Sequence, residues 1–253
     1  AVFAEGTTEL YNIACEPHIQ DLCKMLNAMG SNISGIGSNL LKIEGKTKLS
    51  GCTYTIGPDY MEAGSFIGLA AASKGELLLE NVNIKDIEVI RSGFKKLGIE
   101  ITKKNENSIF VGKQQTCFIE KTLDQKTIKI DDAPWPGFPT DLLSILIVVA
   151  TQMKGTVLIH EKMFESRLYF VDWLIRMGAD IIQCDPHRVV VHGPSLLKCA
   201  DLTSPDVRAG MALLIASICA EGKSKIQNIY QIERGYENIC EKLENIGVQI
   251  KRV

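Results

Sequence analysis

The chain has 253 residues, of which 45% are apolar and 23% are charged, and its formal net charge is −2 at pH 7. These values are ordinary for a globular protein with a large core, and the slightly acidic balance argues against a nucleic-acid partner. No apolar run is long enough to cross a membrane, and residues 1–6 lack the features of a signal peptide, so we expect a cytoplasmic protein.

Paired glycines divide the chain into four copies of one pattern. In each copy a glycine precedes an apolar strand and a helix, and a second glycine follows the first by 23 to 25 residues. The first glycines are Gly6, Gly75, Gly155 and Gly222, and the second are Gly30, Gly98, Gly178 and Gly247. Three residues after each second glycine stands an isoleucine: Ile33, Ile101, Ile181 and Ile250. A period near 70 residues is too long for a solenoid and indicates a duplicated αβ subdomain.

In chain order, the pattern predicts helices over about 17–29, 60–74, 87–97, 141–154, 166–177, 207–221 and 234–246. Three of them are apolar on nearly all sides, which is typical of helices inside a layered protein: 60–74, 141–154 and 207–221. Each of these three ends at the first glycine of a copy, where we expect a left-handed cap. Strands are predicted at 75–82, 155–162 and 222–229, and a hairpin after each second glycine.

The first and last copies are shorter than the middle two. The first keeps only residues 1–5 of its opening helix, and the last stops at Val253 after one strand of its hairpin. Because an unpaired strand edge is unfavourable, we expect further chain before Ala1 and a partner strand near Ile250. The composition changes around residues 50–58. We therefore predict that residues 1–56 form the tail of one domain and residues 57–253 nearly all of a second.

Arginines at the starts of predicted helices are the first candidate site residues. Arg208 opens an apolar helix, and Arg167 and Arg234 share one repeat position, 12 residues after the first glycine of their copies. A cation in the first turn opposes the helix dipole at a cost of roughly 0.3–1 kcal/mol, so these arginines could serve an anion site. The alternative is local salt bridges, such as Arg234 with Glu233 or Arg208 with Asp206.

Asp141 is the second candidate. It opens a predicted helix, as Asp59 and Asp206 do at matching positions. One interpretation is that Asp141 or Thr140 caps that helix. The other is a carboxylate beside the arginines that takes a proton from a hydroxyl group. We expect two of the three aspartates to be caps only.

The histidines and cysteines do not predict a metal site. Cys184, His187 and His192 are close in sequence, but their spacing fits a turn and a strand better than a ligand set. The eight cysteines are scattered and mostly lie in apolar runs, so we expect reduced, mostly buried thiols. No phosphate-loop or dinucleotide-binding glycine motif is present.

Six segments carry a resemblance to a known family. They are AEGTTELYNIACEPHIQDLCKMLNAMG, PDYMEAGSF, PWPGFPTDL, MFESRLYFVDWLIRMGADI, SPDVRAGMALL and IERGYENICEKLENIG. In this order they resemble the UDP-N-acetylglucosamine 1-carboxyvinyltransferases over the whole chain. The resemblance implies a mixed α+β fold, an inside-out α/β barrel (α/β prism) built from repeated βαβαββ units.

The same resemblance implies an activity. The family transfers the enolpyruvyl group of phosphoenolpyruvate to the 3-hydroxyl of UDP-N-acetylglucosamine and releases phosphate. This is the first committed step of peptidoglycan synthesis, and therefore of cell-wall biogenesis, cell shape and cell division. The resemblance implies that the reaction needs no metal and no cofactor.

The family's functional residues fall on matching positions of this sequence. Its substrate contacts are Asp141, Met163, Phe164, Arg167, Arg208 and Arg234. Asp141 would be the base for the sugar hydroxyl, and Met163 and Phe164 would contact the sugar nucleotide. The three arginines would bind phosphoenolpyruvate and support domain closure, with Arg234 also catalytic, because guanidinium groups match both phosphate and carboxylate.

Parts of the family's pattern are absent or changed. Its lysine–asparagine pair and its mobile loop with a cysteine or aspartate would precede Ala1, and Cys52 lacks the context of that loop. Tyr60 stands where many members carry arginine. We therefore expect no turnover by this chain alone, and we expect its partners to be the missing N-terminal part and the two substrates. The alternatives are a 3-phosphoshikimate 1-carboxyvinyltransferase and a non-catalytic binding fragment of the same fold.

Overall fold

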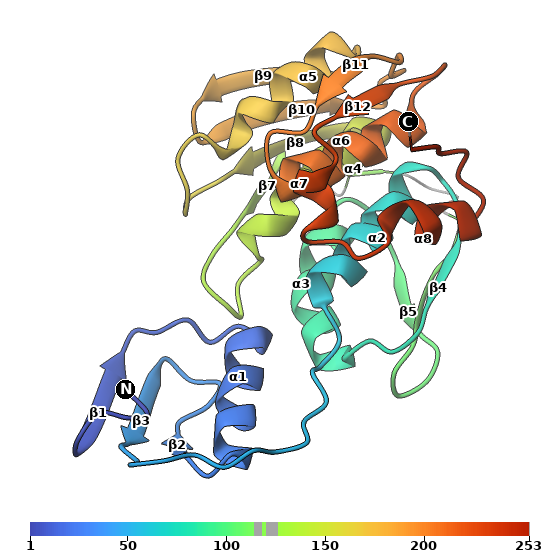
Figure 1. Cartoon of the computed structure of the whole chain (residues 1–253). Helices are drawn as coiled ribbons and strands as arrows, with labels where there is room; N and C mark the ends of the chain where they lie inside the picture. Colours follow the sequence, from blue (N-terminus) through green and yellow to red (C-terminus); the bar gives the residue numbers. More distant parts are fainter. Residues whose placement is uncertain (114–117, 120–125, 253) are drawn as a thin grey trace. The chain divides into compact units, whose positions relative to one another are not determined.

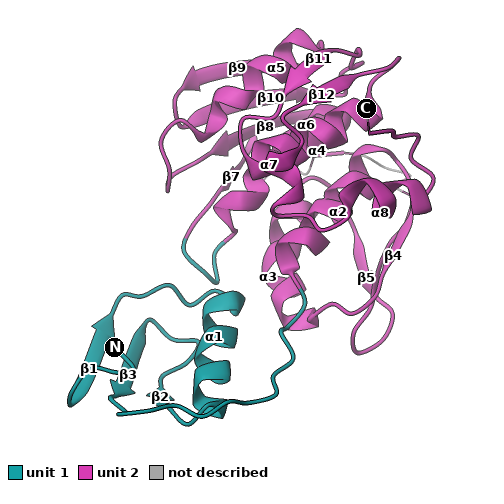
Figure 2. Cartoon of the chain, viewed as in Figure 1, with its two compact units in different colours: residues 1–58, 134–137 teal, residues 59–133, 138–253 magenta. Residues whose placement is uncertain are grey.

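A computed structural model describes residues 1–113, 118–119 and 126–252 (Figure 1). The chain forms two compact units (Figure 2). Unit 1 comprises residues 1–58 and 134–137, and unit 2 comprises residues 59–133 and 138–253. Of the helices in the described ranges, none has the length and apolar character needed to cross a bilayer.

Unit 1 places one helix on a three-stranded antiparallel sheet. Helix α1 (Pro17–Ala28) begins with a proline, whose fixed φ suits the first helical turn. The strands β1 (Thr7–Tyr11), β2 (Asn32–Ser34) and β3 (Leu40–Glu44) lie in the order β1-β3-β2. Buried and exposed residues alternate along β3, so its apolar side chains meet the helix in a small core. That core consists of Cys23, Ile33, Leu41 and Ile43.

Unit 2 holds the other copies of the repeat. The second copy comprises α2 (Tyr60–Ala72), β4 (Leu77–Leu79), α3 (Ile84–Lys96), β5 (Ile101–Lys103) and β6 (Ile109–Val111). The third comprises β7 (Ile128–Asp131), η1 (Thr140–Leu142), α4 (Leu143–Gln152), β8 (Gly155–His160), η2 (Arg167–Phe170), α5 (Val171–Arg176), β9 (Asp180–Asp185) and β10 (Arg188–Gly193). The fourth comprises β11 (Asp201–Thr203), α6 (Val207–Cys219), β12 (Lys225–Gln227), α7 (Tyr230–Glu233) and α8 (Ile239–Asn245).

The strand order repeats in the first three copies, while the fourth has the parallel pair β11–β12 among its described residues. The sheets run β1-β3-β2, β4-β6-β5 and β8-β10-β9, and β7 adds to the last in parallel with β8. The repeated isoleucines lie at equivalent positions and face apolar partners: Ile33 opposite Ile43, Ile101 opposite Val111, and Ile181 opposite Val191. All three isoleucines are buried. The prediction of a duplicated αβ subdomain is confirmed.

The three apolar helices α2, α4 and α6 pack against one another in the interior of unit 2 (Figure 1). Their spacing is close because glycine faces the contact: a Cβ at Gly68 would lie 2.2 Å from Cγ2 of Ile145. Helices inside with sheets outside is the arrangement expected for an inside-out barrel. The prediction that these helices are buried is confirmed.

The structure departs from the predicted helix over 234–246. Instead, α7 ends with Arg234 as its C-cap, and α8 begins only after Asn238, whose φ of +51° is incompatible with a continuous helix. Arg234 therefore does not lie in the first turn of a helix, and the dipole argument is wrong for this residue. Residues 246–252 form no strand, so the structure shows no strand at Ile250.

Two smaller expectations also need correction. Gly155 and Gly222 have a positive φ, but α4 and α6 end before them, at the extended C-cap residues Met153 and Ala220. After α2, Lys74 and not Gly75 has a positive φ, so the expectation of left-handed glycine caps is wrong for all three helices. The seven cysteines among the described residues are free, and only two of them, Cys15 and Cys23, are buried. The expectation of mostly buried thiols is therefore wrong, and Cys117 lies outside the described residues.

Candidate functional site

Asp141 lies between two arginines. Its Oδ1 accepts a hydrogen bond from Nη1 of Arg167 at 2.5 Å, and its Oδ2 accepts one from Nε of Arg208 at 2.9 Å. Partial burial would raise the pKa of Asp141, but Arg208 and Arg167 outweigh that effect and hold the pKa below its ordinary value. At neutral pH the group is therefore a carboxylate flanked by two cations.

The repeat explains why Asp141 is available for this contact. Asp59 accepts hydrogen bonds from the amides at the start of α2, and Asp206 does the same for α6. Asp141 makes no such cap, and the Thr140 hydroxyl bonds Glu161 instead. The expectation that two of the three aspartates are caps is confirmed.

Arg208 is held on its other side by a buried tyrosine. Its Nη1 donates to Oη of Tyr236 at 3.3 Å, and the same Oη lies 2.8 Å from Oγ of Ser65. Tyr236 is 1% exposed. This chain of contacts connects α6, the segment after α7, and α2. Sequence reasoning missed Tyr236 and Ser65; the only available signal was the nearness of Tyr236 to Arg234.

Phe164 joins the group through its ring, over which the Arg167 guanidinium lies 4.8 Å from the centroid. Met163 and Phe164 follow β8 and are 41% and 49% exposed. Arg234 is exposed, and among the described residues no ion pair or side-chain hydrogen bond engages it. The structure thus brings Asp141, Arg167, Phe164 and Arg208 together, but it does not show Met163 or Arg234 in contact with them.

The local salt bridges considered as the alternative do not form. The carboxylate of Glu233 pairs with Arg252 at 2.8 Å, and the guanidinium of Arg208 pairs with Asp141. Asp206 accepts the backbone N–H groups of Arg208 and Ala209 as part of its cap, and it does not pair with the Arg208 guanidinium. The alternative is therefore wrong for both pairs.

Two buried acids, Asp132 and Glu161, lie close to this group in the structure, and sequence reasoning missed both. Glu161 is 0% exposed; its Oε1 accepts the backbone N–H groups of Met163 and Phe164, each at 3.0 Å. Its Oε2 accepts the hydroxyl of Thr140 at 2.6 Å. Burial, and then the neighbouring Asp132, raise the pKa of Glu161 to about 7. The available signal was that each acid directly follows an apolar strand, in IKIDD and LIHE.

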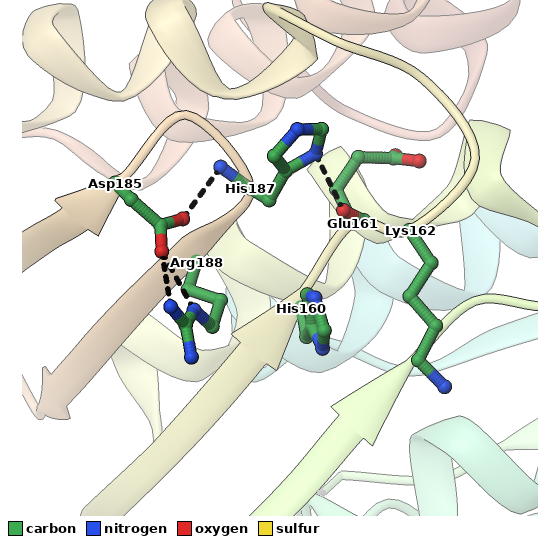
Figure 3. A pocket seen from close by; sticks show the side chains of 6 residues that line it. All are labelled: His160, Glu161, Lys162, Asp185, His187 and Arg188. Atoms are coloured by element: carbon green, nitrogen blue, oxygen red, sulfur yellow. Dashed lines mark hydrogen bonds and ion pairs between the residues drawn. The ribbon is translucent and has the colours of Figure 1, made fainter.

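A cavity of about 420 Å³ opens at the ends of β8 and of the β9–β10 hairpin (Figure 3). Its lining is formed by His160, Glu161, Lys162, Asp185, His187 and Arg188. Burial and the cations Lys129, Lys162 and Arg188 lower the pKa of His160. Within the described ranges, no three His, Cys, Asp or Glu side chains form a group that could hold a metal ion.

Comparisons with known proteins agree with this architecture. A sequence profile of EPSP synthase (3-phosphoshikimate 1-carboxyvinyltransferase) matches residues 1–243. Curated proteins named UDP-N-acetylglucosamine 1-carboxyvinyltransferase are 57% identical in Treponema denticola, 56% in Borreliella burgdorferi and 55% in Bacteroides thetaiotaomicron. The matches cover 99–100% of this chain, which spans 59% of the length of those relatives.

Solved structures show the same fold. The enolpyruvyl transferase NikO from Streptomyces tendae matches with a TM-score of 0.85 at 21% identity, over 99% of this chain and 57% of that protein. EPSP synthase from Acinetobacter baumannii matches with a TM-score of 0.72 at 19% identity, over 100% of this chain and 59% of that protein. The prediction of an enolpyruvyl transferase fold is confirmed.

Proposed function

The chain belongs to the EPSP synthase family, and from this premise we propose that it is part of a UDP-N-acetylglucosamine 1-carboxyvinyltransferase. The identity of 52–57% to curated proteins of that name supports this choice. Identity to the EPSP synthase structures is only 18–19%, which gives the alternative, a 3-phosphoshikimate 1-carboxyvinyltransferase, weaker support. The whole protein would move the enolpyruvyl group of phosphoenolpyruvate to the 3-hydroxyl of UDP-N-acetylglucosamine and release phosphate. Unit 1 would be the tail of one transferase domain, and unit 2 most of the other.

The observation that carries the proposal is the carboxylate of Asp141 between Arg167 and Arg208. With its pKa lowered, this carboxylate is a weak base while both arginines hold it. A phosphoenolpyruvate molecule offers a phosphate and a carboxylate to the same guanidinium groups. Its binding would loosen their hold on Asp141 and raise the basicity of that carboxylate just when the sugar hydroxyl must lose its proton.

The remaining predicted residues have surroundings compatible with their roles. Met163 and Phe164 expose apolar surface, and the Phe164 ring lies against Arg167, which suits a contact for a sugar nucleotide. Arg234 is an exposed cation two residues from Tyr236, which bonds Arg208. It would complete the set of arginines around phosphoenolpyruvate and stabilise charge on the departing phosphate.

The proposed place of the reaction is cytoplasmic peptidoglycan synthesis, and thus cell-wall growth, cell shape and cell division. Both substrates are small polar anions. The partner of this chain would be the remaining part of the same enzyme.

Phosphate release from phosphoenolpyruvate by the whole protein tests the assignment. We expect release with UDP-N-acetylglucosamine as acceptor and none with shikimate 3-phosphate. Release with shikimate 3-phosphate alone would establish the alternative transferase. Binding of either acceptor without release of phosphate would favour a non-catalytic protein of this fold.

A further inference from the structure

We propose that Glu161 and Asp132 share one proton as a buried carboxyl–carboxylate pair, and that this pair positions both sides of the site. One side is the turn that carries Asp141, and the other is the loop with Met163 and Phe164. The consequence for turnover rests on the proposed function. The pair itself rests on the geometry of unit 2 alone.

One carboxylate oxygen of Asp132 lacks a hydrogen-bond donor among the described residues. Asp132 is 0% exposed, and its Oδ1 accepts the backbone N–H of Lys162 at 2.6 Å. Its Oδ2 is also buried. With every acid ionised, no N–H or O–H group in the described part of the chain donates a hydrogen bond to this oxygen. Asp132 and Glu161 are neighbours because each directly follows one strand of the parallel pair β7–β8, in which Asp131 lies opposite His160. A hydrogen bond between their carboxyl groups is one cause of the raised pKa of Glu161. Because leaving a buried charged oxygen unsatisfied is costly, a proton between the two acids is strongly favoured.

The hydrogen bonds of Glu161 locate the shared proton on its Oε2. Oε1 of Glu161 already accepts two backbone N–H groups, so it acts as the carbonyl oxygen. Oε2 therefore carries the proton, donates it to Oδ2 of Asp132 and still accepts the hydroxyl of Thr140. The pair then carries a single negative charge. The pKa of Glu161, raised to about 7 by burial and by Asp132, agrees with this assignment.

Two hydrogen bonds of Glu161 connect the pair to the site. Through Oε2, Glu161 fixes Thr140, the residue directly before Asp141. Through Oε1, it fixes the amide of Phe164, whose ring lies against Arg167. Arg167 in turn binds Asp141. The pair therefore holds both the carboxylate and the aromatic residue that flanks its arginine.

The surroundings do not neutralise a second charge. Lys129 and Lys162 both pair with Asp131, and Arg188 pairs with Asp185. His187 bonds the backbone oxygen of Glu161 through Nδ1 at 3.0 Å, as Figure 3 shows, and not the carboxyl group. His160, the other titratable group at this cavity, is held neutral because its pKa is lowered. On the site side, Arg167 and Arg208 are engaged by Asp141. Loss of the shared proton would set two negative charges against each other and loosen the contacts of Glu161.

Carboxyl carbon-13 NMR of this chain tests the pair without reference to activity. We expect one glutamate signal to titrate near pH 7 and to be absent from Glu161→Gln. In Asp132→Asn the same signal should titrate at least about one pH unit lower, because the neighbouring negative charge is gone. The exposed Glu76→Gln serves as the control and should change neither. If every glutamate titrates below about pH 5.5, the shared proton is refuted.

Steady-state kinetics of the whole protein test the positioning role. In Glu161→Gln the amide oxygen can accept the two backbone N–H groups, and the NH2 group can donate both to Oδ2 of Asp132 and to the hydroxyl oxygen of Thr140. This variant should therefore retain kcat within about threefold at pH 6.5 and lose any decline that accompanies titration near pH 7. Glu161→Ala should lower kcat by roughly tenfold or more, because the turn and loop lose their anchor. Unchanged kinetics and pH profile in both variants would overturn the positioning role.

The two tests separate the two proposals. If the whole protein does not use UDP-N-acetylglucosamine, the proposed function fails, while the NMR titration still decides whether the proton is shared. If no glutamate titrates near pH 7, the pair is refuted, while the transferase assignment stands on its own assay.

Discussion

Oδ2 of Asp141 accepts a hydrogen bond from Nε of Arg208 at 2.9 Å, although 67 residues separate them in the sequence. The two residues belong to the third and fourth copies of the repeat, at the starts of neighbouring buried helices. The packing of α4 against α6 therefore brings a carboxylate and a cation together. The local turn sequence of each supplies the side chain.

Asp141→Asn should lower kcat of the whole enzyme by about 100-fold or more, because the amide cannot accept the hydroxyl proton. The chain should remain folded, since Asp141 caps no helix. The matched control is Asp59→Asn, at the same position in the second copy, where asparagine still caps the helix. Equal kcat in Asp141→Asn and wild type would remove the role of general base.

Arg208→Lys should weaken phosphoenolpyruvate binding by roughly 10- to 100-fold. Lysine cannot at the same time hold Asp141 and Tyr236 as the guanidinium does, and each charge-assisted bond contributes about 1.5–3 kcal/mol. Calorimetric titration of the whole protein with phosphoenolpyruvate measures the change. Arg91→Lys, which affects only the exposed pair with Glu88, should bind as wild type does. Equal affinities in the two variants would contradict the assignment.

The raised pKa of Glu161 predicts a distinct dependence of stability on pH. Between about pH 4.5 and 7 the folded chain binds a proton that the unfolded chain has released. This contribution to the free energy of unfolding is complete below pH 4.5 and is lost as the pH rises through about 7. Urea unfolding at several pH values, with Glu161→Gln as reference, should show wild type losing stability over this window. Parallel curves for the two chains would contradict the raised pKa.

Gly68→Ala should destabilise unit 2 by about 1–3 kcal/mol. The added Cβ would lie 2.2 Å from Cγ2 of Ile145, so the contact between α2 and α4 must open. Gly51→Ala is the control, because its Cβ meets no atom within 4 Å. Thermal unfolding followed by circular dichroism compares the variants. A melting temperature for Gly68→Ala equal to that of wild type would show that the contact between α2 and α4 accommodates the added methyl group.

The sequence predicted the features that follow from local periodicity. The glycine spacing revealed the copies, and the apolar character of α2, α4 and α6 revealed their burial. The aspartates at three equivalent helix starts pointed to caps, with one exception. These predictions succeeded because each depends on a short local pattern, in the first case one that recurs along the chain.

The features that escaped prediction depend on tertiary context. Asn238 adopts a left-handed backbone conformation that interrupts the expected helix, and so Arg234 ends one helix where it was expected to open another. Glu161 and Asp132 follow different strands, and their burial becomes evident only once β7 and β8 pair in parallel. In the sequence each acid is marked only by its place directly after an apolar strand, which does not distinguish a buried acid from an exposed one.

The aspartates at the starts of α2 and α6 cap those helices with their side chains. In the third copy a 3-10 turn precedes the helix, and the equivalent Asp141 makes no cap. Repetition of a subdomain thus permits a division of labour. In two copies the aspartate caps its helix, and in the third copy the equivalent aspartate is free to bind Arg167 and Arg208. For anyone redesigning this scaffold, the same start-of-helix position in the other copies is a ready location for a second reactive carboxylate, once its helix is given another cap.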